Sequence, residues 1–174
     1  CKEIQENVMK SPCFLVPVGH KRSTTPDLEY RMSTSLAERT MVFGMNITQI
    51  RCLIVLKMLT KTRRINEVLK SYFCKTALFC TIDNTSNKGW IEDNLVSCVI
   101  KCLQLLVDCL KSNHMPHYFL TCLDMLEDRF DERERTQIAY TLETVIGDCV
   151  KAIHAIKLDE VGQRLYNKMF KLSR

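Results

Sequence analysis

Residues 93–112 read DNLVSCVIKCLQLLVDCLKS, and this stretch decides the fold class. Its apolar side chains recur at every third or fourth position, which is the spacing of one face of an α-helix. Asp93 or Asn94 is suited to begin that helix, because either side chain can accept a hydrogen bond from a free backbone N–H group. We expect a buried helix whose apolar face consists of Leu95, Val99, Cys102, Leu106 and Leu110.

Helical signals also occupy most of the chain after residue 33. Gly44 is expected to end the first helix and Asn46 to cap the next, with Gln49 at the capping-box position. Ser71 and Asp131 are the expected N-caps of two later helices. The expected helices cover residues 35–43, a longer segment after 46, 72–82, a segment after 94, 116–126, a long segment from 131 to about 156, and 159–172. About seven helices joined by short loops predict an all-α helical bundle.

The spacing of apolar residues also predicts which face is buried in two of these helices. The helix after residue 46 is expected to bury Ile47, Ile50, Leu53, Ile54 and Met58. The long helix after residue 131 is expected to bury Ile138, Leu142, Val145, Cys149, Ile153 and Ile156. Lys57 emerges beside the first of these stripes, a position from which a lysine usually extends along apolar surface with its ammonium in water.

A short β-prone run precedes the helices. Residues 13–19 read CFLVPVG and lie between Pro12 and Gly19. A single strand cannot form a sheet alone. The run is therefore either the last strand of an upstream α/β domain or an extended lead-in packed along the helices.

The chain has 174 residues and 46% hydrophobic content, enough to bury one compact core. Its net charge of +5 is uneven: residues 1–70 hold 12 Lys and Arg against 6 Asp and Glu, and residues 71–174 hold 13 against 14. A local positive field in the first part favours phosphates, on nucleotides or on nucleic acid. An ordinary solvated lysine-rich face explains the same charges.

The ten cysteines are typical of buried free thiols, because Cys98, Cys102 and Cys109 fall inside apolar helical runs and no C-x-x-C pair occurs. We therefore expect a reduced, cytoplasmic protein without a structural zinc site. The sequence begins with Cys1 and a polar stretch unlike a signal peptide, so we expect a piece of a longer protein. Since no apolar run approaches the ~20 residues of a membrane-spanning helix, no membrane span is expected.

Catalytic motifs are missing from the sequence. It contains no P-loop, no Gly-rich dinucleotide fingerprint and no G-x-S-x-G. Acidic residues between positions 126 and 135 alternate with arginines, which is typical of a solvated turn and helix start. These are Glu127, Asp128, Asp131, Glu132 and Glu134, with Arg129, Arg133 and Arg135. No catalytic residue and no metal ligand is predicted in this chain.

Three segments together carry a more specific signal: residues 15–38 (LVPVGHKRSTTPDLEYRMSTSLAE), 70–79 (KSYFCKTALF) and 108–120 (DCLKSNHMPHYFL). In order and spacing they resemble the Mab-21 family of nucleotidyltransferase-fold proteins, over about residues 13–126. The resemblance implies that residues 1–29 are the end of a nucleotidyltransferase-like core and a linker. It implies that residues 30–174 are a carboxy-terminal HhH/H2TH-like helical domain.

In the synthases of this family, the helical lobe closes one side of a nucleotide cleft. The resemblance implies an arginine that contacts base and phosphate, nearby serines, a lysine that reaches the triphosphate, a serine that binds phosphate and a tyrosine that stacks on the base. The matching residues are Arg31, Ser33 or Ser35, Lys57, Ser71 and Tyr72. Read without the resemblance, the same residues are an arginine paired with an acidic neighbour, a snorkelling lysine, an N-cap and a core tyrosine.

Some positions depart from the family pattern. Tyr30 stands where tryptophan is usual, Phe73 and Cys74 replace a histidine-containing sequence, and Asp124 falls where asparagine is expected. A His/Cys-rich zinc insertion found in one DNA-sensing type would fall before Asn46 and is absent. These departures affect the fine geometry of the implied site and make a DNA sensor of that type a weaker expectation.

The resemblance implies that the metal-binding carboxylates and the Gly-Ser motif come from the upstream core. This chain therefore needs no cofactor of its own and cannot transfer a nucleotide unaided, while the full-length protein would use ATP or GTP with Mg²⁺. Cyclic dinucleotide synthesis in innate immunity is the implied role, and a non-catalytic interaction module is the alternative. Double-stranded nucleic acid is a further possible partner, through the basic cluster of Lys61, Arg63, Arg64 and Lys70, which a solvated helix end also explains.

Overall fold

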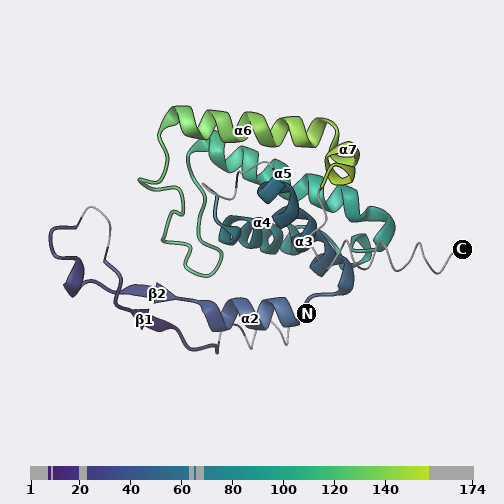
Figure 1. Cartoon of the computed structure of the whole chain (residues 1–174). Coiled ribbons are helices and arrows are strands. Elements are labelled where there is room, and N and C mark those ends of the chain that lie inside the picture. The colour runs from purple at the N-terminus through teal and green to yellow at the C-terminus, as the bar shows by residue number, and fades with distance from the viewer. Residues whose placement is uncertain (1–7, 9, 20–22, 63–64, 66–68, 157–174) are drawn as a thin grey trace, which may run out of the picture.

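The computed structural model describes residues 8, 10–19, 23–62, 65 and 69–156 (Figure 1). Within these ranges the chain forms a helical bundle with one small sheet. The α-helices are α2 Ser35–Phe43, α3 Ile47–Thr62, α4 Ser71–Asp83, α5 Leu95–Ser112, α6 Glu132–Gly147 and α7 Cys149–His154. Single 3₁₀ turns occur at Pro26–Leu28, Asn87–Gly89 and Glu92–Asn94, and the strands are β1 Phe14–Val16 and β2 Arg31–Ser33. The expected all-α bundle is confirmed.

Helix α5 is the centre of the bundle. It packs against α3, α4, α6 and α7. Its buried side chains are Cys98, Val99, Cys102, Leu103, Leu106, Val107 and Leu110, which include most of the predicted apolar face. Because full burial of one such aliphatic side chain contributes ~1.5–3 kcal/mol, this helix supplies much of the stability of the core. In Figure 1, α6 lies on one side of α5, and α2 with the two strands lies at the opposite edge of the bundle.

Capping residues and a glycine in the sequence predicted several helix ends correctly. Helix α2 covers Ser35–Phe43 and ends at Gly44, as predicted. Asn46 and Gln49 form the predicted capping box: each backbone N–H donates to the other's side-chain oxygen at 2.9 Å. Asp131 and Glu134 form a second capping box at the start of α6. These caps satisfy N–H groups that have no partner inside their helices.

The predicted buried face of α3 is wrong in part. Leu53 is buried, but Ile47 is 61% exposed and Ile54 is 50% exposed. The side chains that α3 buries are Thr48, Gln49, Cys52, Leu53, Leu56, Leu59 and Thr60. Apolar residues surround this helix on all sides, so spacing alone does not single out one face. The face is chosen by the neighbouring helices α4 and α5.

Two predicted helices are also wrong. Residues 116–126 form a loop closed by a backbone bridge between Pro116 and Asp124, and the Asp124 carboxylate also accepts hydrogen bonds from two backbone N–H groups. The long helix after Asp131 is two helices, broken at Asp148, whose backbone is not helical (φ −141°, ψ 64°) and whose side chain caps α7. The predicted helix over residues 159–172 lies outside the described residues.

The β-prone run forms a strand, but neither expected arrangement describes it fully. Strand β1 pairs antiparallel with β2, which the sequence did not reveal, with Leu15 opposite Met32. Both of these side chains are exposed. The pairing joins residues on either side of the domain boundary expected at residue 30. In the described part of the chain, none of the helices is both long and apolar enough to span a bilayer.

Candidate functional site

Two of the expected site residues, Ser71 and Tyr72, lie side by side at the start of α4. Ser71 is the first residue of α4 and is exposed, and Tyr72 follows it and is partly buried. The prediction that Ser71 is the N-cap is wrong, because Lys70 holds that position with an extended backbone. The Ser71 hydroxyl therefore stands at the positive end of the α4 dipole, where helices commonly bind anions.

Tyr72 contacts His117 through both its hydroxyl and its ring. The Tyr72 Oη lies 2.5 Å from His117 Nε2, and the two ring centroids are 5.1 Å apart. The ammonium of Lys75 lies 5.5 Å from the centre of the Tyr72 ring. Tyr72 is thus a partly buried aromatic residue at the edge of the core, held by contacts with His117 and Lys75.

The hydrogen bonds of His117 define where its proton lies. The backbone N–H groups of Phe119 and Leu120 donate to Nδ1 at 3.2 and 3.1 Å. Nδ1 therefore carries no proton, and the neutral ring carries its hydrogen on Nε2, from which it donates to the Tyr72 hydroxyl. Burial lowers the pKa of His117, against the opposing charge of Glu38, so the neutral form is favoured.

An ion pair between Glu38 on α2 and Lys75 on α4 completes this network. Both side chains are largely shielded from solvent. Burial raises the pKa of Tyr72 to about 12, and the charge of Glu38 acts in the same direction. The phenol therefore remains protonated at neutral pH and can act as a hydrogen-bonding group.

The segment around β2 reaches the same place. The hydroxyl of buried Thr34 acts to lower the pKa of Tyr72. Ser33 and Ser35 flank Thr34, and their hydroxyl oxygens are 3.3 Å apart. Arg31 is exposed on β2 and forms no ion pair with an acidic residue in the described ranges. Its guanidinium therefore faces solvent.

Lys57 lies on the α3 side of this site. It is exposed, and its positive charge acts to lower the pKa of the Cys74 thiol, which burial raises to about 11. Cys74 lies in the first turn of α4, two residues after Tyr72. The charge of Lys57 therefore acts on Cys74 across the contact between α3 and α4, and the Lys57 side chain is exposed.

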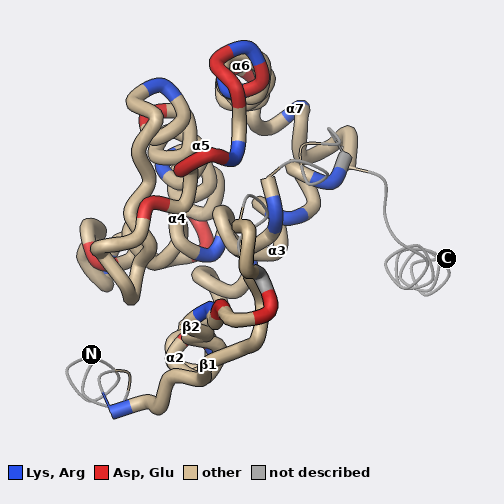
Figure 2. The backbone as a smooth tube through the Cα atoms, turned by 90° about the vertical axis from the view of Figure 1, so that its left-hand side faces the viewer, with Lys and Arg blue, Asp and Glu red and all other residues tan. Residues whose placement is uncertain are grey.

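The predicted nucleic-acid cluster is described only in part. Lys61 is exposed near the end of α3, and Lys70 is exposed immediately before α4. Arg63 and Arg64 lie outside the described residues. Figure 2 shows basic segments along α3.

Asp124 has a structural role in the loop that carries His117. Burial acts to raise its pKa, but hydrogen bonds from the backbone N–H groups of Met115 and Leu126 and from His114 outweigh it, so the pKa is lowered. The carboxylate thus holds the two ends of residues 115–126 together. Among the described residues, no group of three or more histidine, cysteine or acidic side chains is arranged to hold a metal ion.

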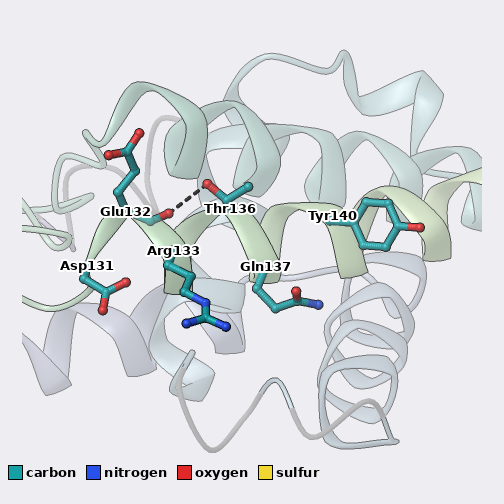
Figure 3. Close-up of a pocket in the computed structure, with 6 residues that line it drawn as sticks. All are labelled: Asp131, Glu132, Arg133, Thr136, Gln137 and Tyr140. Atoms are coloured by element: carbon teal, nitrogen blue, oxygen red, sulfur yellow. Dashed lines mark hydrogen bonds between the residues drawn. The ribbon is translucent and has the colours of Figure 1, made fainter.

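A shallow depression on the outer face of α6 lies apart from this network (Figure 3). It is lined by Asp131, Glu132, Arg133, Thr136, Gln137 and Tyr140. Asp131 is already engaged in its capping box, and Thr136 donates to the Glu132 carbonyl. As the sequence predicted, this acidic and basic stretch forms a helix start.

The sequence analysis did not select Glu38, Lys75 or His117, although a signal was present. Each lies in a different one of the three segments that resemble Mab-21 proteins: Glu38 ends residues 15–38, Lys75 lies in residues 70–79, and His117 lies in residues 108–120. In the folded chain these three segments meet around Tyr72.

Comparison with known proteins confirms the resemblance to the Mab-21 family. Residues 48–144 match the Mab-21 protein HhH/H2TH-like domain, and this chain belongs to that family. The chain is also similar to cyclic GMP-AMP synthase of Mus musculus, with 23% identity over 150 residues, and of Sus scrofa, with 25% identity over 164 residues. These alignments cover 76% and 81% of the chain but only 30% and 33% of the relatives. The chain spans about a third of the length of the curated relatives it matches.

Proposed function

We propose that this chain is the helical lobe of a nucleotidyltransferase-like protein and supplies one side of a purine-nucleotide cleft. The observation that carries the proposal is that Ser71 and Tyr72 lie side by side at the accessible start of α4. Ser71 is exposed at the helix N-terminus, Tyr72 is partly exposed beside it, and the charge of Lys57 on α3 acts on Cys74 in the same helical turn.

Each group in this proposal suits one part of a nucleotide. The Ser71 hydroxyl, the α4 N-terminus and the Lys57 ammonium would bind phosphate oxygens. The Tyr72 ring would stack on the base, sharing its surface with Lys75, and Arg31 would contact base and phosphate from β2. Ser33 and Ser35 would offer further hydroxyl groups from the neighbouring segment.

The names of the relatives support a more specific role for the full-length protein. Both are cyclic GMP-AMP synthases. By this likeness, the full-length protein would use ATP or GTP with Mg²⁺ in cyclic dinucleotide synthesis, as a cytoplasmic enzyme of innate immunity. The residues of this chain would bind and orient the nucleotide, and the metal-binding carboxylates would come from the nucleotidyltransferase-like core.

The test is calorimetry of ATP and GTP binding to the full-length protein that contains this chain. Tyr72→Ala should weaken binding by about 1–3 kcal/mol through lost base stacking. Lys57→Ala should weaken triphosphate binding more than nucleoside binding, and it should reduce the salt dependence of affinity, because lysine contributes charge rather than shape.

Matched controls are available on helices α5 and α6, outside the proposed site. Tyr140 on α6 and Lys101 on α5 are exposed residues of the same types, and their alanine variants should bind like the wild type. If Tyr72→Ala unfolds the lobe and Lys57→Ala leaves triphosphate affinity unchanged, the nucleotide site should be abandoned.

A second candidate is a non-catalytic interaction module, favoured by apolar side chains that α3 and the strands leave exposed. These include Leu15, Met32, Ile47 and Ile54. The two candidates differ in the sequence of the full-length protein upstream of this lobe. A Gly-Ser pair followed by spaced acidic residues supports the enzyme, and their absence supports the interaction module.

Duplex nucleic acid remains a further proposed partner, because Lys61 and Lys70 are exposed at adjoining helix ends. Phosphate contacts by such lysines depend strongly on salt. A titration with duplex DNA and duplex RNA at low salt tests this partner, and lack of binding there ends the idea.

A further inference from the structure

We propose that His117 is a positioning residue, which orients the Tyr72 ring for base stacking through a hydrogen bond from Nε2–H to the phenol oxygen. This inference rests on the proposed nucleotide site and deepens it. His117 itself need not touch the nucleotide, since it acts through Tyr72.

The direction of this hydrogen bond follows from the other side of the imidazole. Two backbone N–H groups point at Nδ1, so this nitrogen acts as the acceptor and Nε2 carries the hydrogen. The Tyr72 oxygen, 2.5 Å away, accepts it. The phenol hydrogen remains available for another acceptor.

The loop that carries His117 is closed by its own backbone bonds. The His117 N–H donates to the Leu123 carbonyl at 2.9 Å, and the Met125 N–H donates to the Met115 carbonyl at 2.8 Å. Turning the imidazole away would break its bonds to Phe119 and Leu120 as well as the bond to Tyr72. The loop thus holds the ring at a fixed place.

A second contact to Tyr72 comes from Lys75, which is itself paired with Glu38 on α2. Lys75 lies over the Tyr72 ring, and Glu38 holds the Lys75 ammonium. Together His117 and this ion pair restrict both the tilt and the rotation of the tyrosine before any ligand binds. A side chain fixed in advance loses less conformational entropy on binding, so a pre-oriented ring binds a base more tightly than a free one.

Two substitutions separate the two functions of the imidazole. In His117→Asn the amide oxygen lies near the position of Nδ1, so it can still accept from Phe119 and Leu120 but cannot reach Tyr72. In His117→Gln the longer side chain brings an N–H donor near the position of Nε2 but gives up the loop bonds. Tyr72→Phe removes the accepting oxygen and keeps the aromatic ring.

The experiment measures ATP and GTP affinity of the full-length protein carrying these variants. His117→Asn and Tyr72→Phe should each lose about three- to tenfold in affinity, the worth of one hydrogen bond. The double variant should lose no more than either single one, because both remove the same bond. His117→Gln should recover affinity towards the wild-type value. NMR of the imidazole nitrogens should show the hydrogen on Nε2 in the wild type.

The outcomes also separate this inference from the proposed function. If the wild type binds no purine nucleotide, or Tyr72→Ala binds as the wild type does, the proposed site is wrong and the inference is abandoned with it. If Tyr72→Ala weakens binding but His117→Asn and Tyr72→Phe do not, the site stands and the positioning role is wrong. Additive losses in the double variant also overturn it. Should His117→Gln fail to fold, the other variants decide.

Discussion

Glu38 on α2 forms an ion pair with Lys75 on α4, and the two side chains are 16% and 22% exposed. The pair lies where two segments far apart in the sequence meet beside Tyr72. Water cannot fully solvate a charge that is shielded in this way. Removing one partner therefore leaves the other charge unpaired and destabilises the protein. The pair therefore ties the strand-bearing edge of the molecule to the helical bundle.

Glu38→Gln should destabilise the protein by about 1–2 kcal/mol, less than for a fully buried pair because some solvent reaches both groups. Urea unfolding measures the change. Glu92→Gln is the matched control: it removes the ion pair with Arg51, in which the Glu92 side chain is 75% exposed, and should cost less than about 0.5 kcal/mol. Equal losses in the two variants would contradict this reading of the structure.

Stability should depend on pH through His117. Because burial lowers its pKa in the folded protein below the ordinary value of about 6.5, the unfolded chain binds the proton first as pH falls. The contribution of His117 is therefore complete above pH of about 6.5 and declines as pH falls below that value. The charge of Glu38 opposes the effect, and Lys75 neutralises part of that charge.

Unfolding free energies measured between pH 5 and 7.5 test this dependence. The decline should be shallower in His117→Asn, which has no proton to bind at this position. It should persist in His114→Gln, where the changed residue is the exposed partner of Asp124. A His117→Asn variant with the wild-type slope would show that another group is responsible.

The observed orientation of α3 can be tested by comparing substitutions of one buried and one exposed residue in this helix. Leu56→Ala should cost about 2–5 kcal/mol, because Leu56 is fully buried and its truncation leaves a cavity. Ile54→Ala should cost well under half as much, since Ile54 is largely exposed. Thermal melts of the two variants give the comparison. The orientation would be refuted if Ile54→Ala were the more damaging change.

The described cysteines should be free thiols that differ in reactivity. Cys52 and Cys102 are buried with their sulfurs 4.0 Å apart, about twice the length of a disulfide bond. Burial raises the pKa of Cys74 to about 11, so this side chain remains a protonated thiol, which is less reactive than a thiolate. An alkylating agent should therefore modify exposed Cys13 and Cys122 in the native protein and the buried thiols only after unfolding.

Mass measurement without reducing agent provides the readout for these thiols. The expected mass is that of a chain without internal disulfides. A native disulfide that includes Cys52 or Cys102 would contradict both the geometry and the expectation of a reduced protein.

The sequence predicted features that depend on near neighbours. Gly44, Asn46 and Gln49 act within one or two turns, so the end of α2 and the cap of α3 were correct. The buried face of α5 was largely correct because its apolar residues occupy a single stripe. In α3, where apolar residues surround the helix, the choice of face depends on packing and was missed.

Features that depend on distant or side-chain contacts were not predictable in the same way. The loop over residues 116–126 depends on Asp124 and His117 bonding to backbone groups, which helical spacing cannot reveal. The pairing of Tyr72 with His117 spans 45 positions. For the candidate site, the resemblance selected Tyr72 and Ser71, while the supporting residues Glu38, Lys75 and His117 required the fold.

The pairing of β1 with β2 has a practical consequence for dividing this chain. A version that begins at residue 30 would retain Arg31–Ser33 but lose Phe14–Val16, its hydrogen-bonding neighbour. The remaining strand would present unpaired backbone groups beside exposed Met32, which is how an open sheet edge recruits a second molecule. Self-association of such a truncated protein would then reflect the cut itself and not the oligomeric state of the intact lobe.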